Sequence, residues 1–451
     1  LFDEAEKLET EPEANAEPHT EPVTGYQRNK PKRKPLPKDL PREQIIHDID
    51  DADKTCDGCG HGLHRMGEAT SEQLEFIPAS IKVIEHIRPK YSCRHCEQQG
   101  TETAIKVAAV PPQPIPKSIA TPSLLAQVIT SKYQYALPLH RQESMFQHYG
   151  IDLSRKTMAD WMIKCSALLQ PIYQALKATQ LQQRVIQADE TPLKVIHEDK
   201  SRCYMWVYCT GTDSPQTQGD PPPNSVLYDY RNSRRGQCPV DYLQGYGGYL
   251  QVDGYAGYEQ TDATLVGCWA HVRRKFVEAK QAQPKGKTGK ADWAISQIGK
   301  LYRVETEIKP LCADEKQQQR ALNSQPLLEQ FKAWLDKSSL QVPPKSAVGK
   351  AIAYALRQWP KLIRYVENGQ LNIDNNRAER AIKPFVIGRK NWLFANTARG
   401  AQASATLYSL VETAKANGLT PFDYLKQLLE ALPTQPDDLE YLMPWNLKPP
   451  E

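Results

Sequence analysis

The chain has 451 residues, of which 24% are charged and 40% are apolar, a composition typical of globular proteins and unlike that of disordered or fibrous chains. Its length predicts two to four domains. It has no apolar run near the roughly 18 residues of a membrane span and no secretory signal at its start, so we expect a cytoplasmic protein without a membrane partner. Because the first residue is Leu1 rather than Met, we expect a fragment or a partial reading frame.

The first 44 residues separate their charges into two blocks, although the net charge of the chain is only +4. Residues 1–22 carry eight Asp or Glu, and residues 26–42 carry seven Lys or Arg between prolines. Such blocks bury too little apolar surface to offset the loss of chain entropy. We therefore expect residues 1–44 to be a disordered acidic and basic linker. The basic block could contact DNA phosphates, but a solvated linker is the simpler interpretation.

Residues 45–110 contain two C-x-x-C pairs, Cys56 with Cys59 and Cys93 with Cys96, separated by 33 residues. Each pair turns the chain so that two thiolates face one ion, and four thiolates complete a tetrahedral zinc site. A domain with so small an apolar core needs the metal to fold. We predict a zinc-ribbon domain that holds a structural Zn2+ and contacts DNA or another protein.

A proline-rich spacer at residues 110–116 leads to a helical region at residues 117–180. Helices are predicted to begin at the N-cap residues Thr121 and Ser154. The region is a candidate helix-turn-helix-like DNA-binding unit. Amphipathic helices around Trp161 would also serve as plain core, and the sequence leaves both interpretations open.

Residues 181–282 change to a strand pattern. Three consecutive strand candidates (RVIQA, RCYMWVYCT and SVLYDYR) precede a helical stretch and two further strands (GGYLQVD and ATLVGCW), the last of which leads into a helix. Three strands followed by alternating helix and strand is a ribonuclease-H-like order. We predict the first part of an α/β ribonuclease-H-like catalytic core here.

Residues 283–372 contain at least three amphipathic helices, which predict an α-helical insertion into this core. The second part of the core is expected at residues 373–430, where a long helix ends at Gly418. Residues 431–451 are expected to be an irregular tail. The predicted architecture is a ribonuclease-H-like core with an α-helical insertion, a small N-terminal zinc ribbon and a helical DNA-binding region.

Three acidic residues lie where such a core would bring them together. Asp189 and Asp253 end the apolar runs of the first and fourth predicted strands, and Glu379 lies near the start of a helix after the insertion. Carboxylates from strand ends and a neighbouring helix can hold two divalent cations roughly 3.5–4 Å apart for phosphodiester chemistry. We predict that Asp189, Asp253 and Glu379 are the catalytic residues and the ligands of Mg2+ or Mn2+.

Each acid also has a simpler interpretation. Asp189 and Asp253 could form turns at strand ends, and Glu379 could close a capping box with Asn376 as the N-cap. Glu190 follows Asp189, but adjacent strand residues point to opposite faces, so only one of the two can enter the site.

Basic residues gather near the acids in two groups that suit a phosphate backbone better than a small acidic substrate. A solvated helix face explains the first group equally well and the second group less well. The predicted DNA-binding residues are Arg273, Arg274 and Lys275 in the first group and Arg377, Arg380, Lys383, Arg389 and Lys390 in the second.

Two further pairs of residues have open roles. Cys268-x-x-His271 follows the fifth predicted strand and could be half of a metal site, but the sequence has no second pair at a suitable spacing, which favours core packing. Trp392 and Phe394 could stack on an unpaired base, although core packing is again the simpler interpretation.

Long motifs in a fixed order make the chain similar to the transposases of the insertion-sequence 66 type. The motifs are QADETPLKV, YLQVDGYAGY, CWAHVRRKF and DNNRAERAIKPFVIGRKNWLFANTARGAQASATLYSLVETAKANG, and they follow the two C-x-x-C pairs. The resemblance covers nearly the whole chain. It implies a ribonuclease-H-like core with an acidic triad, a helical insertion before the final acid and an N-terminal zinc-binding module.

On that resemblance, the triad positions fall on Asp189, Asp253 and Glu379, and the zinc positions on Cys56, Cys59, Cys93 and Cys96. The implied function is a DNA transposase that binds the terminal inverted repeats of its element, cleaves phosphodiester bonds and joins the 3′ ends to target DNA. A regulatory DNA-binding protein derived from an inactive transposase, or a nuclease that does not join, is the alternative.

The resemblance also implies partners and surroundings. We expect double-stranded DNA as the main partner, a homo-oligomer on that DNA, accessory proteins of the same element and a place at the bacterial nucleoid. Family members usually begin with a leucine-rich coiled-coil segment. The opening LFDEAEKLE resembles the stretch that follows such a segment, so we expect the segment itself to be missing.

Overall fold

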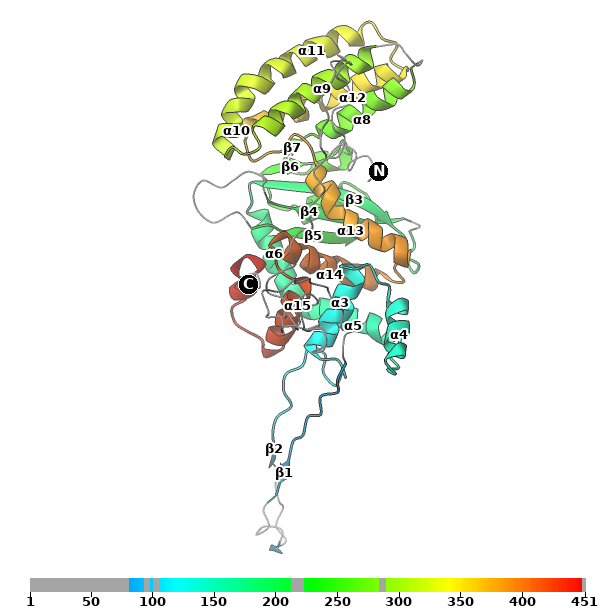
Figure 1. Cartoon of the computed structure of the whole chain (residues 1–451), viewed down its shortest axis with the longest axis vertical. Coiled ribbons are helices and arrows are strands. Elements are labelled where there is room, and N and C mark those ends of the chain that lie inside the picture. The colour runs from blue at the N-terminus through cyan, green and yellow to red at the C-terminus, as the bar shows by residue number, and fades with distance from the viewer. Residues whose placement is uncertain are drawn as a thin grey trace, which may run out of the picture. The chain divides into compact units, whose positions relative to one another are not determined.

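The computed structural model describes residues 81–92, 98–99, 106–200, 202–211, 223–283 and 289–447. By its contacts the chain divides into two compact units, Thr10–Pro89 and a larger unit made of Leu1–Glu9 and Lys90–Glu451. The larger unit contains the helices and strands described below (Figure 1). The predicted linker at residues 1–44 and most of the predicted zinc ribbon lie outside the described residues.

A two-stranded antiparallel ribbon and four helices come first along the larger unit. The ribbon pairs β1 (Lys90–Tyr91) with β2 (Lys106–Val107). The helices are α3 (Pro122–Tyr133), α4 (Leu139–His148), α5 (Arg155–Leu168) and α6 (Gln170–Leu181).

The two helix starts predicted in this region are confirmed. The hydroxyl of Thr121 accepts the amide of Leu124 at 3.3 Å, and the hydroxyl of Ser154 accepts the amide of Thr157 at 3.2 Å. Such caps satisfy amides that have no partner within the helix. Trp161 on α5 is 4% exposed and belongs to the main apolar core, in keeping with the plain-core interpretation of these helices.

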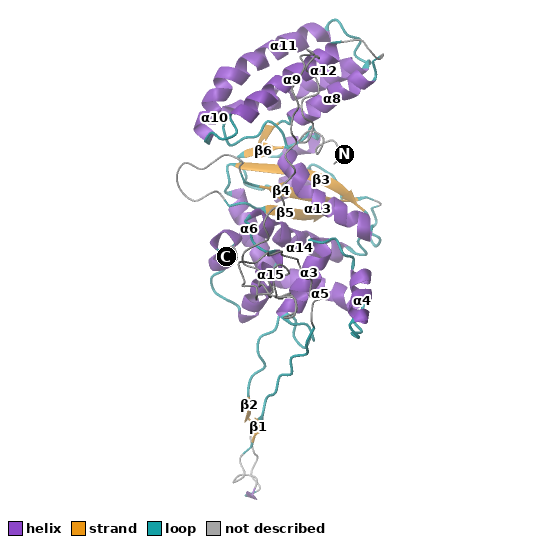
Figure 2. Ribbon diagram, in the orientation of Figure 1, coloured by secondary structure: helices purple, strands orange, loops and turns teal. Residues whose placement is uncertain are grey.

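A five-stranded mixed sheet follows, with the strand order β5–β4–β3–β6–β7 (Figure 2). β3, β4 and β5 pair antiparallel, whereas β3, β6 and β7 pair parallel. The strands are β3 (Val185–Leu193), β4 (Cys203–Cys209), β5 (Val226–Arg231), β6 (Tyr249–Gln251) and β7 (Thr264–Val266). All five lie where the sequence predicts strands.

Two details of this region differ from the prediction. β3 does not end near Asp189 but continues to Leu193, because its antiparallel pairing with β4 runs as far as Cys203. The helical stretch after β5 is only α7 (Gln237–Tyr242), and a 3-10 turn, η2 (Ala256–Gln260), follows β6.

The edge strand β5 is covered by α14 (Ala398–Ala416). The amide of Tyr228 donates to the hydroxyl of Ser409 at 2.8 Å, and the amide of Val226 donates to the hydroxyl of Thr413 at 3.0 Å. Ser409 and Thr413 are four residues apart and therefore lie on one helix face. The helix thereby satisfies edge amides that would otherwise remain open for pairing.

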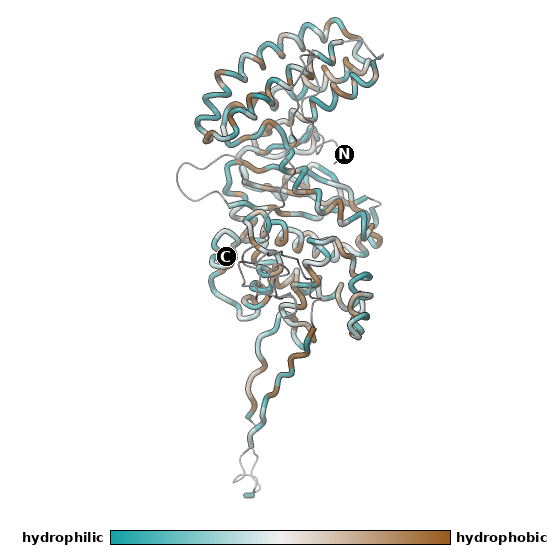
Figure 3. The backbone as a smooth tube through the Cα atoms, in the orientation of Figure 1, coloured by the Kyte–Doolittle hydropathy of each residue, from teal (hydrophilic) through white to brown (hydrophobic). Residues whose placement is uncertain are grey.

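The predicted helical insertion has an apolar core of its own. Its helices α9 (Lys290–Glu307), α11 (Gln325–Ser339) and α12 (Ala347–Leu362) pack around aromatic side chains together with α8 (Trp269–Gln281), which precedes the predicted insertion. Figure 3 shows apolar and polar residues alternating along these helices, as the amphipathic pattern predicts. Short elements link them: α10 (Ala313–Gln319), a π turn at Arg320–Ser324 and η4 (Ile363–Glu367).

Arg320 fixes the segment by which the chain leaves the insertion. Its side chain is 1% exposed and donates to the carbonyls of Tyr365, Asn368 and Leu371, while Glu305 accepts from it at 2.6 and 2.8 Å. A guanidinium whose donors are all engaged holds an irregular segment rigidly. The chain then enters the helix that carries Glu379.

That helix, α13 (Asn376–Trp392), packs against β3 and β4, as Figure 1 shows. After α14 the chain forms α15 (Pro421–Ala431) and three 3-10 turns at Leu432–Thr434, Glu440–Leu442 and Pro444–Asn446. In the part of the chain that the structure describes, no helix has the length and hydropathy of a membrane span.

Candidate active site

Asp189 and Asp253 occupy matching positions relative to two adjacent parallel strands. The register pairs Gln187 of β3 with Gln251 of β6; Asp189 lies two residues further along β3, and Asp253 lies two residues beyond the end of β6. The side chains of Gln187 and Gln251 are joined by a hydrogen bond of 3.0 Å, so they share one face of the sheet. Because side chains alternate along a strand, Asp189 lies on that same face, and the chain places Asp253 beside it.

The Asp189 carboxylate lies in an unfavourable electrostatic environment. Burial, followed by the nearby carboxylates of Glu190, Asp253 and Glu379, raises its pKa well above the usual range, and a hydrogen bond of 2.8 Å from the amide of Glu190 opposes the rise only in part. The electrostatic influence of Asp253 and Glu379 on Asp189 indicates that the fold brings the three predicted acids together. A bound divalent cation would neutralise this repulsion.

Asp253 is held by its own turn and by the insertion. Its Oδ1 accepts the amide of Tyr255 at 2.8 Å. A Cβ at position 254 would lie 2.7 Å from the hydroxyl oxygen of Tyr354 on α12, so Gly254 allows the insertion to approach the residue next to the acid. The insertion therefore supports the site directly.

Glu379 reaches the same face through two hydrogen bonds made by the segment before α13. The side chain of Asn375 donates to the carbonyl of Ala188 at 2.8 Å, and the side chain of Gln251 donates to the carbonyl of Asn372. These bonds tie the start of α13 to the strand positions that precede Asp189 and Asp253.

The capping-box interpretation of Glu379 is wrong. The N-cap residue is Asn375, one position before the predicted Asn376, and the helix has no side-chain cap hydrogen bond. The Glu379 carboxylate, 13% exposed, instead faces α8: its Oε1 lies 3.8 Å from Nδ1 of His271 and its Oε2 lies 4.0 Å from Arg274.

The structure adds His271 and Arg274 to the site. The sequence left the role of His271 open and assigned Arg274 only to a group of DNA-binding residues. Burial lowers the pKa of His271, while Glu379 opposes that shift more strongly than any other neighbour. The signal in the sequence was the C-x-x-H pattern, which indicates that Cys268 and His271 lie close together at the start of a helix. The pattern does not indicate which distant residue contacts them.

Glu190 lies on the other face of β3, as the strand alternation predicts. Its side chain is 1% exposed, accepts a hydrogen bond of 2.7 Å from Nε of Arg234 and accepts another of 2.7 Å from the hydroxyl of Tyr258. The ring of Tyr255 lies 4.1 Å from the Arg234 guanidinium. This cluster anchors the segment after Asp253 from behind the site.

The predicted DNA-binding residues have different surroundings. Arg380, Lys383 and Lys390 lie with Ile387 on one outward stripe of α13, at helical spacing from the site. Arg389 donates to the hydroxyl of Thr191 at 3.0 Å and to the carbonyl of Pro192, so it fixes α13 to β3.

The remaining predicted basic residues lie nearer to other protein groups. Arg377 donates to the carbonyl of Thr210 at 3.5 Å, and Lys275 pairs with Glu278 at 2.9 Å. Arg273 on α8 is half-buried. Which of these residues contact DNA stays a prediction.

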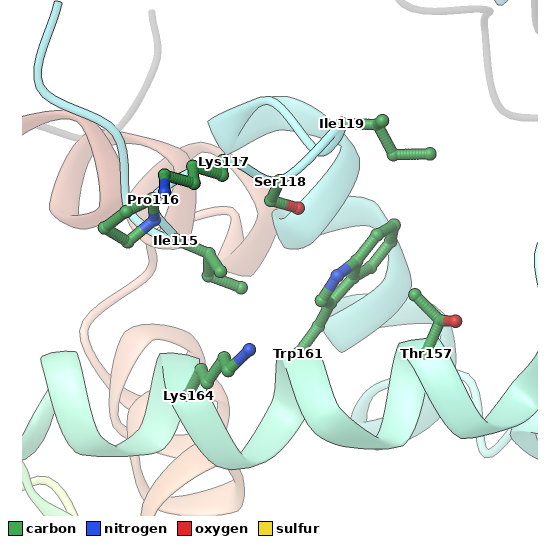
Figure 4. A pocket seen from close by; sticks show the side chains of 8 residues that line it. All are labelled: Ile115, Pro116, Lys117, Ser118, Ile119, Thr157, Trp161 and Lys164. Carbon is green, nitrogen blue, oxygen red and sulfur yellow. The ribbon is translucent and has the colours of Figure 1, made fainter.

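The two aromatic candidates for base stacking have different surroundings in the structure. Trp392 packs edge-on against Phe385 at 5.5 Å, as the core interpretation predicts, whereas Phe394 is 43% exposed. A cavity of about 270 Å3 lies beside Trp161 and is lined by residues 115–119 and by α5. Figure 4 shows the side chains that line it. None of its lining residues belongs to the carboxylate site.

The four predicted zinc ligands, Cys56, Cys59, Cys93 and Cys96, lie outside the described residues. Their region is nevertheless recognised by comparison with known families. Residues 53–97 match the zinc-finger binding domain of transposase IS66, which supports a structural zinc.

Three further family models match the chain. Residues 117–403 match the transposase IS66 family and residues 409–445 match the IS66 C-terminal element. Residues 1–45, expected from their charge blocks to be a linker, match the model described as transposase C of IS166 homeodomain.

Relatives that match most of the chain come from Sinorhizobium fredii. The uncharacterized protein y4jD is 34% identical over 418 residues, covering 89% of this chain and 79% of the relative. The uncharacterized protein y4hP is 33% identical over 414 residues, covering 87% and 73%. No solved structure matches the chain. Because a single family model covers residues 117–403 and includes all three acids, the chain belongs to the IS66 family of transposases.

Proposed function

We propose that this protein is a DNA transposase that cleaves the ends of its element and joins the freed 3′ ends to target DNA. The observation that carries the proposal is the matching position of Asp189 on β3 and Asp253 just after the parallel strand β6, with Glu379 tied to the same face. The strand order supports a ribonuclease-H-like core, with the insertion between its last strand and α13.

The carboxylates fit divalent cations by their charge and surroundings. Asp189, Asp253 and Glu379 would hold Mg2+ or Mn2+. The raised pKa of Asp189 reflects burial first and then like charges, which such ions would offset. When bound, two such ions supply activation of the attacking hydroxyl and stabilisation of the leaving oxygen. The acids act as ligands and not as proton carriers.

The other residues orient the site and the substrate. His271 and Arg274 hold Glu379 from α8, and the Glu190 cluster holds the segment after Asp253. The α13 stripe of Arg380, Lys383 and Lys390 would bind the phosphate backbone that leads into the site. In the first reaction water cleaves a phosphodiester bond and frees a 3′ hydroxyl; in the second this hydroxyl attacks a target phosphodiester and displaces another 3′ oxygen.

Substrates and partners follow from this chemistry. We propose terminal inverted repeats and target DNA as the bound duplexes, a homo-oligomer that brings the two ends together, and accessory proteins of the same element as further partners. The four cysteines Cys56, Cys59, Cys93 and Cys96 are the proposed ligands of the structural Zn2+.

The test is a cleavage and joining assay on DNA that carries the element's own ends, with Mg2+ or Mn2+ added. Metal-dependent nicking followed by joining in the wild type, absent in Asp189→Ala, supports the proposal. Cleavage without joining would favour a nuclease. Binding without cleavage, repeated with accessory proteins added, would favour a regulatory DNA-binding protein.

A further inference from the structure

A thiol, an imidazole and a carboxylate from three parts of the chain converge beside the acidic site. Cys268 directly precedes α8, His271 lies in the first turn of α8, and Glu379 lies in the first turn of α13. One ligand atom from each residue lies within 4.8 Å of the other two. The sequence offered Cys268 and His271 as half of a metal site, and the fold adds a third ligand from more than one hundred residues away.

Two atoms of this cluster are buried without a hydrogen-bond partner. They are Nδ1 of His271 and Oε1 of Glu379, which face each other at 3.8 Å. This distance is too long for a hydrogen bond, and leaving both atoms unsatisfied is costly. A nitrogen and an oxygen ligand on one tetrahedral Zn2+, with bond lengths of about 2.0–2.2 Å, lie roughly 3.3–3.6 Å apart, a few tenths of an ångström less than the observed separation.

Backbone amides near the Cys268 sulfur stabilise its thiolate form, which is the form that binds a cation. Sγ accepts the amide of Asn375 at 3.3 Å, and the amide of His271 also favours the thiolate. Burial still raises the pKa of the thiol, so without a cation the group is neutral. A coordinated divalent ion deprotonates a thiol outright and reverses that preference.

We propose that Cys268, His271 and Glu379 form a Zn2+ site that is separate from the zinc-finger domain and shares Glu379 with the Mg2+ site. Thiolate and imidazole ligands select Zn2+, whereas Mg2+ prefers oxygen ligands. Three protein ligands leave a fourth position open to water. Arg274, at 4.0 Å from Oε2 of Glu379, faces the oxygen that the zinc does not use.

A functional consequence follows, and it rests on the proposed function. When Zn2+ binds, Glu379 is tied to Cys268 and His271 on α8 and is withdrawn from Asp189 and Asp253. Zinc should therefore inhibit Mg2+-dependent cleavage, and excess Mg2+ should relieve the inhibition.

The first measurement is the zinc content of the full chain by atomic emission after equilibration with Zn2+ and removal of excess ion. The wild type is expected to hold one more zinc ion per chain than Cys268→Ala or His271→Gln. Cys165→Ala is the matched control, because Cys165 is a buried free thiol outside the cluster, and it should keep the wild-type content. Circular dichroism identifies a variant that fails to fold, in which case the other variant decides. Equal zinc content in the wild type and a folded variant overturns the proposal.

A second measurement compares zinc inhibition of Mg2+-dependent cleavage, each protein scaled to its own activity without zinc. The wild type should need at least tenfold less Zn2+ for half-inhibition than Cys268→Ala. Equal sensitivity of the two proteins to Zn2+ would contradict the proposed competition between Zn2+ and Mg2+ for Glu379. If zinc contents differ as expected but neither protein cleaves DNA, the zinc site stands and the proposed function fails.

Discussion

Two neighbouring acids on β3 have opposite surroundings. Burial and then the carboxylates of Glu190, Asp253 and Glu379 raise the pKa of Asp189, whereas Glu190 on the other face is held by Arg234 and Tyr258. Burial of Glu190, followed by the carboxylate of Asp253, also raises its pKa, but the hydroxyl and the guanidinium oppose the shift. The rise at Glu190 is thus opposed by two side chains, whereas the rise at Asp189 is opposed by a backbone amide.

This difference separates a functional acid from a structural one. Polar groups inside a protein are normally satisfied, and a cluster of repelling carboxylates persists where it has a chemical use. Residue type and position in the sequence are nearly identical for the two acids, so only their neighbours distinguish the roles. The following changes test that distinction.

The largest expected effect is on catalysis by Asp253→Asn. The variant keeps the shape of the side chain but loses a metal ligand, so cleavage should fall by about a thousandfold or more, equivalent to at least ~4 kcal/mol. Affinity for element-end DNA and zinc content should not change. Loss of the folded state, seen by circular dichroism, would contradict a catalytic role for this face.

The second-largest expected effect is a loss of stability in Glu190→Ala. The change leaves Arg234 and Tyr258 without their acceptor and should lower the free energy of unfolding by about 2 kcal/mol, at the modest end for a buried charge because Arg234 remains partly solvated. Urea denaturation measures it. At 25 °C the folded variant should retain metal-dependent cleavage; a loss as large as that of Asp253→Asn would place Glu190 in the catalytic set instead.

The pH dependence of the protein's stability tests whether the pKa of Asp189 is raised, without any assay of activity. Since the folded-state pKa of Asp189 is raised, the native protein binds a proton that the unfolded chain releases, and stability falls as pH rises above about 4 until the folded pKa is passed. Without added Mg2+, Asp189→Asn should melt at a higher temperature than wild type at neutral pH. The two proteins should converge near pH 4.

Added Mg2+ should reverse that order. At ten times the dissociation constant, Mg2+ should stabilise the wild type by about 1.4 kcal/mol and the variant by much less. A wild type that melts above Asp189→Asn in metal-free buffer at neutral pH would mean that the carboxylates do not repel as the structure indicates.

The smallest effect concerns the stripe that leads away from Asp189 along α13. Lys390→Gln should weaken binding of element-end DNA and reduce the slope of log affinity against log salt by about 0.9, the value for one lost phosphate contact. Lys426→Gln on α15 is the matched control, since it removes an exposed lysine of another helix. Equal slopes for the two variants would remove Lys390 from the DNA surface.

Local patterns predicted much of the fold. Short apolar runs between turn-rich segments marked all five strands, and the caps Thr121 and Ser154 marked two helix starts, because these signals depend on neighbours within a few residues. The same patterns selected Asp189 over Glu190, since the strand period alone assigns opposite faces to adjacent residues. These features were determined by the sequence itself.

Other features were decided only by the tertiary structure. The register that matches Gln187 with Gln251, the reach of β3 to Leu193, and the approach of Cys268 and His271 to Glu379 depend on contacts between segments far apart in the chain. A one-residue slip in strand pairing would be compatible with similar local patterns but would reverse every face. Such choices depend on long-range packing. For that reason the sequence identified the candidate acids, whereas the tertiary structure determined which residues surround them.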